Sequence, residues 1–433
     1  MRRLRVWLGT ILVGELAQDE AGRLRFQYDP IYLATPDARP ISVSLPTTEA
    51  TFEERACLPF FDGLLPESLQ RTTVAKALGV SENNTFSLLD RLGGEVAGAL
   101  AFLHEGEDPA PVAPAQPAAP LEDSALAELL AELPARPLLA GSRGLRLSLA
   151  GAQSKLPVCL MDGRICLPAP GQPTTHILKP AIQGLKGSTE NEAFVMMLAA
   201  ELGLPVANVE ARTLAVEGNR GSFLLVERYD RLVQGGRVQR LHQEDFCQAL
   251  GVPSSRKYQS EGGPGFKACF DLLRRISTVP GPDLARLLDL AIFNAVAGNA
   301  DAHAKNLSLL HTAEGVRLAP FYDLLCTAHY PHLETAFAMR IGDQNAFERL
   351  GLLAWRQFSQ RAGLGFPLVR RRILDLGERT PEACRKTRAR LTGRGLDEAV
   401  LEALERRIAE RARGMMQRIH LDDHLPTGPD HEL

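Results

Sequence analysis

The sequence predicts an α+β protein with three parts along the chain: a small α+β subdomain, a sheet-rich lobe and a helical lobe. Three observations predict this arrangement. Runs of alternating polarity followed by helical patterns open the chain, strand patterns separated by glycine-containing loops fill its middle, and helical periodicity dominates from Leu241 onward. The length of 433 residues exceeds the roughly 250 to 300 residues at which single cores stop growing, which also favours several substructures.

The first part, residues 1–107, is expected to be a compact α+β subdomain. Alternating polarity predicts strands, and apolar residues at helical spacing predict helices between the third strand and the fourth. The predicted strands cover residues 4–7, 11–16, 25–28 and 96–103, and the predicted helices cover residues 60–65, 69–78 and 87–92.

Residues 108–120 read DPAPVAPAQPAAP, and this repetition of Pro and Ala with almost no core-forming residue predicts an extended linker. We expect the sheet-rich lobe over residues 121–240 and the helical lobe over residues 241–433. The sheet of the middle lobe should be twisted and antiparallel. Its predicted strands cover residues 145–149, 156–161, 164–167, 176–179 and 223–228, and its predicted helices cover residues 121–133 and 190–202.

The composition disfavours several classes of protein. The 49 Lys and Arg residues against 52 Asp and Glu residues give a formal charge of -3, so the whole chain has no electrostatic drive toward nucleic acid or an anionic membrane. The N-terminus lacks the apolar core of a signal peptide, and no apolar run approaches the roughly 18 residues of a membrane span. The seven cysteines show no CxxC spacing, which disfavours structural zinc and a disulfide framework. We therefore expect a cytoplasmic protein without membrane contact.

The most informative motif is GNADAHAKN at residues 298–306, followed by PFYD at residues 320–323. Phosphoryl transfer needs an aspartate that accepts the proton of the acceptor hydroxyl, an amide oxygen for magnesium a few residues later, and a second carboxylate that holds metal against the phosphates. Asp301, Asn306 and Asp323 occur in that order, and the apolar runs at 307–310 and 316–318 predict a hairpin that leads to Asp323. The motif predicts an ATP- and magnesium-dependent kinase.

Two other interpretations of this motif stay open from the residues alone. Asp and Asn are common in turns, so Asp301 and Asn306 are compatible with ordinary loop caps. Asp301, His303 and Asp323 also offer the donor atoms of a transition-metal hydrolase site, although a second pair of histidines at ligand spacing is missing.

Three further segments fit the needs of a kinase. Lys179 ends a predicted strand and Glu192 lies in the next predicted helix, so the two can form the ion pair that holds nucleotide phosphates, with Glu190 as the competing partner. A solvated surface pair is the simpler alternative. The small residues of LAGAQSK at 149–155 allow backbone N–H groups to approach phosphates. ERYD at 227–230 stands where a hinge between lobes offers backbone groups to adenine, although a charged strand end explains it equally well.

In chain order, these segments resemble the HipA-type serine/threonine kinases, the toxin half of bacterial toxin–antitoxin pairs. The resemblance spans nearly the whole chain, through ARPISVSLP, FFDGLLPES, RLSLAGAQSK, TTHILK, NEAF, VERYDR, QEDFCQALG, GGPG, DAHAKN and FYD. It implies a two-lobed protein-kinase-like fold behind an extra N-terminal subdomain.

The resemblance implies a role for each matching residue. Asp301 is the expected catalytic base, and His303 is expected to support the loop and the phosphates. The expected magnesium ligands are Asn306 and Asp323. Ser148, in RLSLAGAQ, matches the family's autophosphorylated serine. The expected nucleotide-binding residues are Ala150, Gly151, Ala152, Gln153 and Lys179, with Glu227 and Tyr229 at the adenine hinge.

The resemblance also implies ATP and Mg²⁺ as cofactors, phosphorylation of an aminoacyl-tRNA synthetase, and neutralisation by a helix-turn-helix antitoxin through which the protein touches DNA indirectly. The residues leave two other classes open: a kinase of small molecules that uses the same aspartates, and a non-catalytic corepressor bound to an antitoxin on DNA. The intact aspartates and Lys179 disfavour the corepressor. The basic stretch at 370–394 is compatible with contact to DNA phosphates, although a solvated helix face with internal ion pairs is the more common role of such mixed charges.

Overall fold

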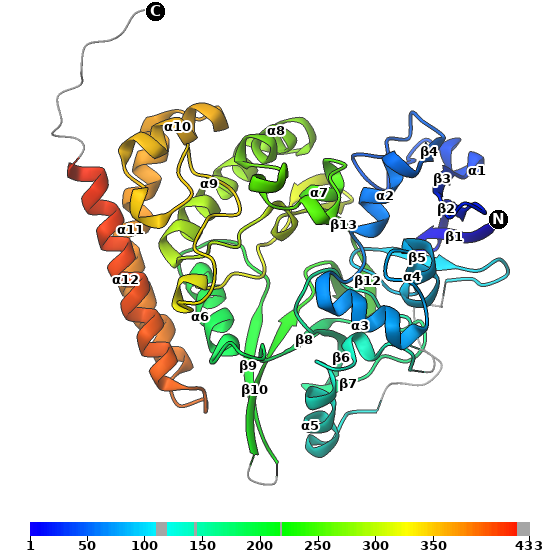
Figure 1. The fold of residues 1–433 in the computed structure, drawn as a ribbon, viewed down its shortest axis with the longest axis horizontal. Coiled ribbons are helices and arrows are strands. Elements are labelled where there is room, and N and C mark those ends of the chain that lie inside the picture. Colours follow the sequence, from blue (N-terminus) through cyan, green and yellow to red (C-terminus); the bar gives the residue numbers. More distant parts are fainter. Residues whose placement is uncertain (110–118, 143–144, 217–218, 422–433) are drawn as a thin grey trace, which may run out of the picture.

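The computed structural model describes residues 1–109, 119–142, 145–216 and 219–421. Most of the predicted linker, residues 110–118, lies outside the described residues. Figure 1 shows the N-terminal subdomain on the right, the helical lobe on the left and the second sheet between them.

The N-terminal subdomain is a five-stranded antiparallel sheet with helices packed on it. The strand order is β4-β3-β2-β1-β5, so the last strand returns to pair with the first. Strand β3 buries Leu24, Phe26 and Tyr28 in the core and exposes the residues between them, as its alternating sequence predicts. The elements are β1 (Arg2–Leu8), β2 (Ile11–Gln18), β3 (Leu24–Tyr28), α1 (Pro30–Leu33), β4 (Thr51–Glu53), α2 (Glu54–Asp62), α3 (Ser68–Leu78), α4 (Thr85–Leu92) and β5 (Leu100–Leu103).

The strand predicted over residues 96–103 begins only at Leu100, so the prediction was wrong for its first half. Gly98 has a φ of +83°, and its N–H donates a hydrogen bond to the Asp230 carboxylate at 2.7 Å. The Gly98 N–H is therefore bound to a distant aspartate and is not free to pair with a neighbouring strand.

The second sheet is also antiparallel, in the order β7-β6-β8-β10-β9. Its faces enter different cores, because Phe223 and Leu225 of β10 pack in a small core with α5, whereas Leu224 and Val226 pack with α6 and the helical lobe. The sheet therefore joins the lobes. The elements are α5 (Asp123–Glu132), β6 (Leu156–Met161), β7 (Arg164–Cys166), β8 (His176–Pro180), α6 (Ser188–Glu201), β9 (Val209–Val216) and β10 (Asn219–Glu227).

The strand predicted over residues 145–149 is not formed. Leu147 makes an isolated bridge to Glu95, the Glu95 N–H donates to the Arg146 carbonyl at 2.9 Å, and the Ser148 N–H donates to the Glu95 carbonyl at 2.8 Å. The N-terminal subdomain therefore binds the backbone of this segment, which keeps it out of the second sheet.

Helices dominate the C-terminal lobe, as the sequence predicts. One continuous core runs from α6 to α12, with Trp355 fully buried in it. A small sheet in the order β13-β14-β15 interrupts the helices, and β14-β15 is the hairpin predicted ahead of Asp323. Among the described helices, none is long and apolar enough to cross a membrane.

The elements of this part of the chain include eleven strands and α-helices and several short 3₁₀ helices. The strands are β11 (Arg231–Gln234), β12 (Arg237–Arg240), β13 (His242–Asp245), β14 (Ser308–Thr312) and β15 (Gly315–Leu318). The α-helices are α7 (Phe246–Ala249), α8 (Phe266–Ile276), α9 (Pro280–Ala297), α10 (Leu352–Ala362), α11 (Phe366–Leu391) and α12 (Glu398–Leu421). The 3₁₀ helices in the described residues are η1 (Pro137–Leu139), η2 (Ser254–Arg256), η3 (Gln259–Glu261), η4 (Ala304–Asn306), η5 (Thr327–His329) and η6 (Phe347–Arg349).

The basic residues near the end of α11 form ion pairs with neighbouring helices. Arg388 pairs with Glu405 of α12, and Lys386 and Arg390 pair with Glu201 of α6. The alternative to a DNA contact expected ion pairs within the helix, and Arg379 with Asp375 and Arg385 with Glu382 form such pairs in α11.

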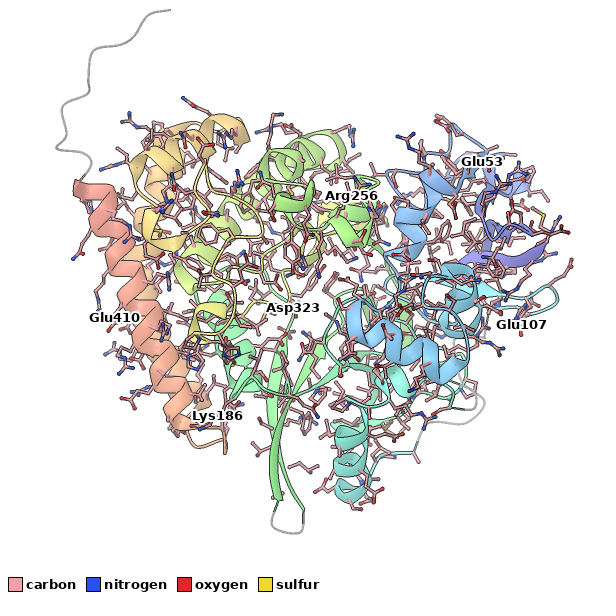
Figure 2. The ribbon with its side chains drawn as sticks, viewed as in Figure 1. Glu53, Glu107, Lys186, Arg256, Asp323 and Glu410 are labelled. Atoms are coloured by element: carbon pink, nitrogen blue, oxygen red, sulfur yellow. The ribbon has the colours of Figure 1, made fainter. Side chains whose placement is uncertain are left out.

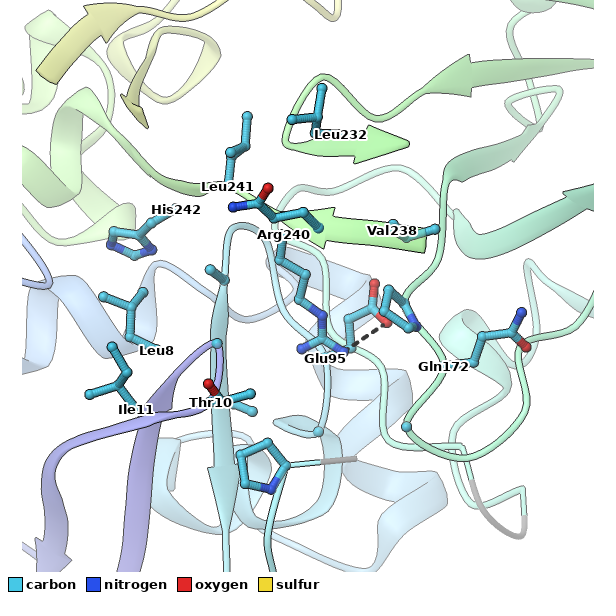
Figure 3. A pocket seen from close by; sticks show the side chains of 18 of the residues that line it. Leu8, Thr10, Ile11, Glu95, Gln172, Leu232, Val238, Arg240, Leu241 and His242 are labelled. Carbon is cyan, nitrogen blue, oxygen red and sulfur yellow. Dashed lines mark ion pairs between the residues drawn. The ribbon is translucent and has the colours of Figure 1, made fainter. Parts of the chain in front are cut away.

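The N-terminal subdomain docks on the rest of the chain through buried charges. Glu95 lies 3.0 Å from Arg228 and 2.9 Å from Arg231, and all three side chains are almost fully buried. Glu95 also lines a cavity of about 1220 Å³, together with the β1-β2 turn and the β11-β12 hairpin. Figure 3 shows this cavity from close by. None of the site residues predicted from the sequence lines this cavity, so the candidate active site lies elsewhere.

Candidate active site

Lys179, Glu192 and Asp323 meet near the centre of the molecule, where Figure 2 labels Asp323. The Lys179 Nζ lies 2.6 Å from Glu192 Oε1 and 2.8 Å from Asp323 Oδ1. Strand β8 supplies the lysine, α6 supplies the glutamate, and the segment after β15 supplies the aspartate. The predicted Lys179–Glu192 ion pair is therefore present, whereas the competing Glu190 accepts a hydrogen bond from the backbone of Asp397.

The charges of this cluster are set by its own members. Burial disfavours a charge on Lys179, but Asp323 and Glu192 raise the pKa of its ammonium group above the ordinary value, so Lys179 stays protonated. Burial also disfavours a charge on Asp323, yet the ammonium groups of Lys179 and Lys155 hold the pKa of this carboxyl well below its usual range. Asp323 is thus an ionised carboxylate.

The backbone of Asp323 is held in an uncommon conformation. Its φ of +60° lies in the left-handed region, where residues with a Cβ pay roughly 1–2 kcal/mol, somewhat less for Asp. Such strain persists only where neighbouring contacts fix it, and it clusters at functional sites. The ion pair with Lys179 is one contact that fixes this carboxylate.

The glycine-containing loop at 149–155 closes against the same cluster. The Lys155 Nζ donates to the Ala150 carbonyl at 2.7 Å, and burial together with the nearby charge of Lys179 lowers the pKa of Lys155 to about 8. Gly151 has a φ of +109°, and a Cβ at this position would lie 2.6 Å from the Lys155 Nζ. The loop therefore places a second lysine beside Lys179 only because residue 151 is a glycine.

The remaining residues of the loop lie at its outer end. Ala152 is exposed, and the Gln153 amide donates to the Pro180 carbonyl at 3.4 Å, which ties the loop to the end of β8.

Asp301 and Asn306 lie on the loop between α9 and β14. Asp301 Oδ1 accepts a hydrogen bond from the Tyr258 hydroxyl at 3.0 Å, and the Asn306 side-chain nitrogen donates to the Asp301 carbonyl at 3.1 Å. Because the nitrogen of Asn306 holds the loop, its side-chain oxygen is the atom suited to a cation. Asp301 is exposed, but partial desolvation of the carboxyl raises its pKa, which suits a group that accepts a proton.

His303 supports this loop from inside. Burial and the nearby charge of Lys257 lower the pKa of its ring to about 3, so the imidazole is neutral. The ring packs edge-on against Tyr258 with centroids 5.4 Å apart. Among the described residues, its Nδ1 has no hydrogen-bond partner, so a buried polar atom is left for a bound ligand to satisfy.

The two predicted hinge residues differ in how they reach the site. Tyr229 stacks on Tyr322 with ring centroids 5.7 Å apart, which connects it to the neighbour of Asp323 in the chain. Glu227 is exposed, and its side chain accepts a hydrogen bond from Asn208 at 2.8 Å. In the described residues, no contact joins Glu227 directly to the lysine–carboxylate cluster.

Ser148 is fully buried in this arrangement. Its hydroxyl donates to the Leu64 carbonyl at 2.8 Å, and its N–H is bound to Glu95. The expected autophosphorylation site is therefore packed against the N-terminal subdomain and reaches solvent only if the loop moves.

Sequence reasoning missed Tyr258, Lys257 and Glu67, which are connected by contacts from Asp301 to the N-terminal subdomain. Tyr258 binds Asp301 directly, and Lys257 lies 2.8 Å from Glu67 of the N-terminal subdomain. Glu67 stands in FFDGLLPES, where a charged residue directly follows a buried apolar run. That break in the apolar pattern was the available signal.

The residues fit magnesium better than a transition metal. In the described part of the chain, no three His, Cys, Asp or Glu side chains lie together where they could hold a metal ion, so the hydrolase site of Asp301, His303 and Asp323 is not formed. Asp323 and Asn306 instead offer one carboxylate and one amide oxygen, the hard donors that magnesium takes while keeping several of its waters.

The two-lobed fold, the lysine–glutamate pair and the ordered Asp, Asn and Asp residues define the chain as a protein kinase. The HipA N-terminal domain matches residues 4–103, and the HipA-like C-terminal domain matches residues 147–387. The chain belongs to the HipA family of serine/threonine kinase toxins.

Individual relatives cover almost all of the chain. Y4mE of Sinorhizobium fredii, named as a candidate kinase, is 50% identical over 95% of this chain and 98% of its own length. The serine/threonine-protein kinase toxin HipA of Shewanella oneidensis is 31% identical over 88% of each chain. The solved Shewanella oneidensis HipA, in complex with HipB and operator DNA, superposes with a TM-score of 0.84 at 28% identity, over 98% of this chain and 100% of that one. The predicted two-lobed α+β fold is thereby confirmed.

Proposed function

We propose that this protein transfers the terminal phosphoryl group of Mg-ATP to a serine or threonine hydroxyl of another protein. The observation that carries the proposal is the meeting of Lys179, Glu192 and Asp323, with Lys155 beside them. A cationic pair next to an ionised carboxylate suits a polyphosphate with its metal, because the lysines neutralise phosphate oxygens and the carboxylate holds the cation.

Each residue then has a defined task. Asp301 orients the acceptor hydroxyl and takes its proton, and the raised pKa of its carboxyl favours that transfer. Asp323 and Asn306 would hold magnesium, which supplies charge neutralisation on the phosphates. Lys179 and the loop residues Ala150 to Gln153 bind the phosphates, and Tyr229 and Glu227 lie at the adenine end. His303 keeps the catalytic loop in place as a neutral ring.

The proposed substrate and partner rest on the resemblance to the family. The solved Shewanella oneidensis relative is bound to HipB and operator DNA. We extend to this chain a helix-turn-helix antitoxin as partner, contact with DNA only through that antitoxin, and an aminoacyl-tRNA synthetase as the phosphorylated protein.

Self-limitation through Ser148 is part of the same proposal. A phosphate adds roughly -1.5 to -2 charges and three acceptor oxygens, and Ser148 is buried beside the loop that would surround the phosphates of ATP. A phosphorylated Ser148 cannot remain there, so the loop leaves the site and nucleotide binding weakens.

The test incubates the purified chain with labelled Mg-ATP and a bacterial lysate, then identifies the labelled species by mass spectrometry. A labelled aminoacyl-tRNA synthetase together with phosphate on Ser148 is the expected result. Asp301→Ala serves as the control for contaminating kinases. Label on small molecules alone would show that the protein is a small-molecule kinase and not a protein kinase. Absence of any transfer by the folded wild-type chain would reject the kinase activity.

A further inference from the structure

The N-terminal subdomain reaches the active site through the segment that ends at Glu67. Glu67 follows the buried run Leu64 to Pro66 and precedes α3, and its side chain is almost fully buried although it is charged. Burial disfavours this charge, but Lys305 and Lys257 lower the pKa of the carboxyl below its usual value, so it is ionised. A buried carboxylate contributed by one subdomain and neutralised by another needs an explanation.

The carboxylate of Glu67 binds two lysines, one beside Tyr258 and one in the catalytic loop. Oε2 lies 2.8 Å from the Lys257 Nζ, and Oε1 lies 3.6 Å from the Lys305 Nζ. Lys305 belongs to the DAHAKN motif and is buried between Glu67 and Asp245, whose Oδ2 lies 2.7 Å away. Lys257 precedes Tyr258, the residue that donates to Asp301.

The backbone of Glu67 binds the glycine-containing loop. Its N–H donates to the Gly151 carbonyl at 3.2 Å, next to an isolated parallel bridge between Pro66 and Gly151. One residue of the N-terminal subdomain therefore contacts the loop that carries Lys155 through its backbone, and the loop that carries Asp301 through its carboxylate.

We infer that Glu67 is a positioning residue of the kinase reaction, which fixes the catalytic loop through Lys305 and the Asp301 carboxylate through Lys257 and Tyr258. The inference rests on the proposed kinase function and deepens it: the N-terminal subdomain is a working part of the active site. Removal of the carboxylate leaves two buried or half-buried ammonium groups without a shared anion, and the loop that carries the base then loses its fixed position. Groups that orient a catalytic residue typically contribute roughly 10- to 100-fold in activity.

The central variant is Glu67→Gln, which keeps the shape and the backbone contact to Gly151 but removes the charge. Asp62→Asn is the matched control, because Asp62 is a carboxylate of the same subdomain that also reaches the segment before Lys257, at Ser254, 3.0 Å away, without touching the catalytic loop. Lys257→Met removes the same contact from its other side and serves if Glu67→Gln folds poorly.

Two measurements on the full chain separate positioning from simple stability. In steady-state phosphoryl transfer, we expect Glu67→Gln to lower kcat about 10- to 100-fold with the KM for ATP changed less than about threefold. Amide hydrogen exchange at residues 301–306 should be faster in Glu67→Gln and Lys257→Met and unchanged in Asp62→Asn. This second measurement needs no activity, so it separates the inference from the proposed function, which the wild-type rate tests.

Three results would overturn the inference. Unchanged exchange at residues 301–306 in Glu67→Gln would show that the carboxylate does not hold the loop. A loss carried wholly by the KM for ATP would place the effect of Glu67 in the glycine-containing loop. An equal loss of kcat in Asp62→Asn would make the effect one of general docking between subdomains.

Discussion

Replacing Ser148 with aspartate is expected to weaken the binding of Mg-ATP strongly, because the buried position 148 cannot hold a charge. The serine hydroxyl lies in a fully buried site and donates to the Leu64 carbonyl. Losing that bond leaves the buried carbonyl without a donor, which costs roughly 1–3 kcal/mol. A carboxylate at the same place must also lose its water without gaining a cation or donor, at a cost of several kcal/mol.

Position 148 is buried only while the glycine-containing loop lies against the N-terminal subdomain. The aspartate therefore favours the conformation in which this loop has moved away from the nucleotide site. If these costs leave the loop in place in only about 1% of the molecules, the apparent affinity for the nucleotide falls roughly 100-fold. The increase in melting temperature on addition of Mg-ATP measures this, because a ligand that binds only the folded site stabilises by mass action. Ser148→Ala controls for the lost hydrogen bond and Ser81→Asp, at an exposed position of the same chain, controls for the added charge. A wild-type Mg-ATP shift in folded Ser148→Asp would refute the reasoning.

Three further predictions concern the residues that bind and transfer phosphate. Asp301→Ala and Asp323→Asn should each lower phosphoryl transfer by about 100-fold or more while circular dichroism stays native, because one lacks the base and the other the metal carboxylate; a folded double variant with wild-type transfer would contradict the site. Lys179→Ala should lose the Mg-ATP melting shift, since it removes the charge shared by Glu192 and Asp323; an unchanged shift would point to Lys155. The proposed nucleotide site needs Lys155 in its charged form, and the pKa of Lys155 is about 8, so nucleotide affinity should be present below pH 8 and fall about tenfold per unit above it, as isothermal titration at pH 7 and pH 9 would measure. Lys155→Arg should lose this dependence.

Local patterns predicted much of the fold. Alternation and helical spacing gave β1 to β3, β6, β8 and the helices α3 to α6 with boundaries close to those observed. The Lys179–Glu192 pair was predictable because strand and helix are consecutive and the two residues are 13 apart in the chain. Motif order likewise predicted that Asp323 follows a hairpin, as β14-β15 confirms.

What the sequence could not predict depends on contacts between distant segments. The stretch 145–149 has a strand-like pattern, but its backbone forms hydrogen bonds with Glu95 of the N-terminal subdomain instead of with the second sheet. The N–H of Gly98 likewise donates to the Asp230 carboxylate instead of to a neighbouring strand. The Lys257–Glu67 pair joins residues 190 positions apart, and Ser148 finds its acceptor 84 positions away. No periodicity carries such information, because it arises only when the subdomains pack.

The segment from Leu64 to Glu67 contacts both the glycine-containing loop and the lysines near the catalytic loop, through different atoms. The Leu64 carbonyl and the Glu67 N–H bind Ser148 and Gly151 of the glycine-containing loop, whereas the Glu67 carboxylate binds the lysines of the catalytic region. Ejection of the loop breaks the first set of contacts and leaves the second intact, so it should remove nucleotide binding without displacing Asp301. Loss of the carboxylate should do the reverse. The two perturbations then act on different steps, and a variant that carries both measures the coupling between them, because both sets of contacts come from the segment Leu64 to Glu67 and the effects of neighbouring contacts do not add in general.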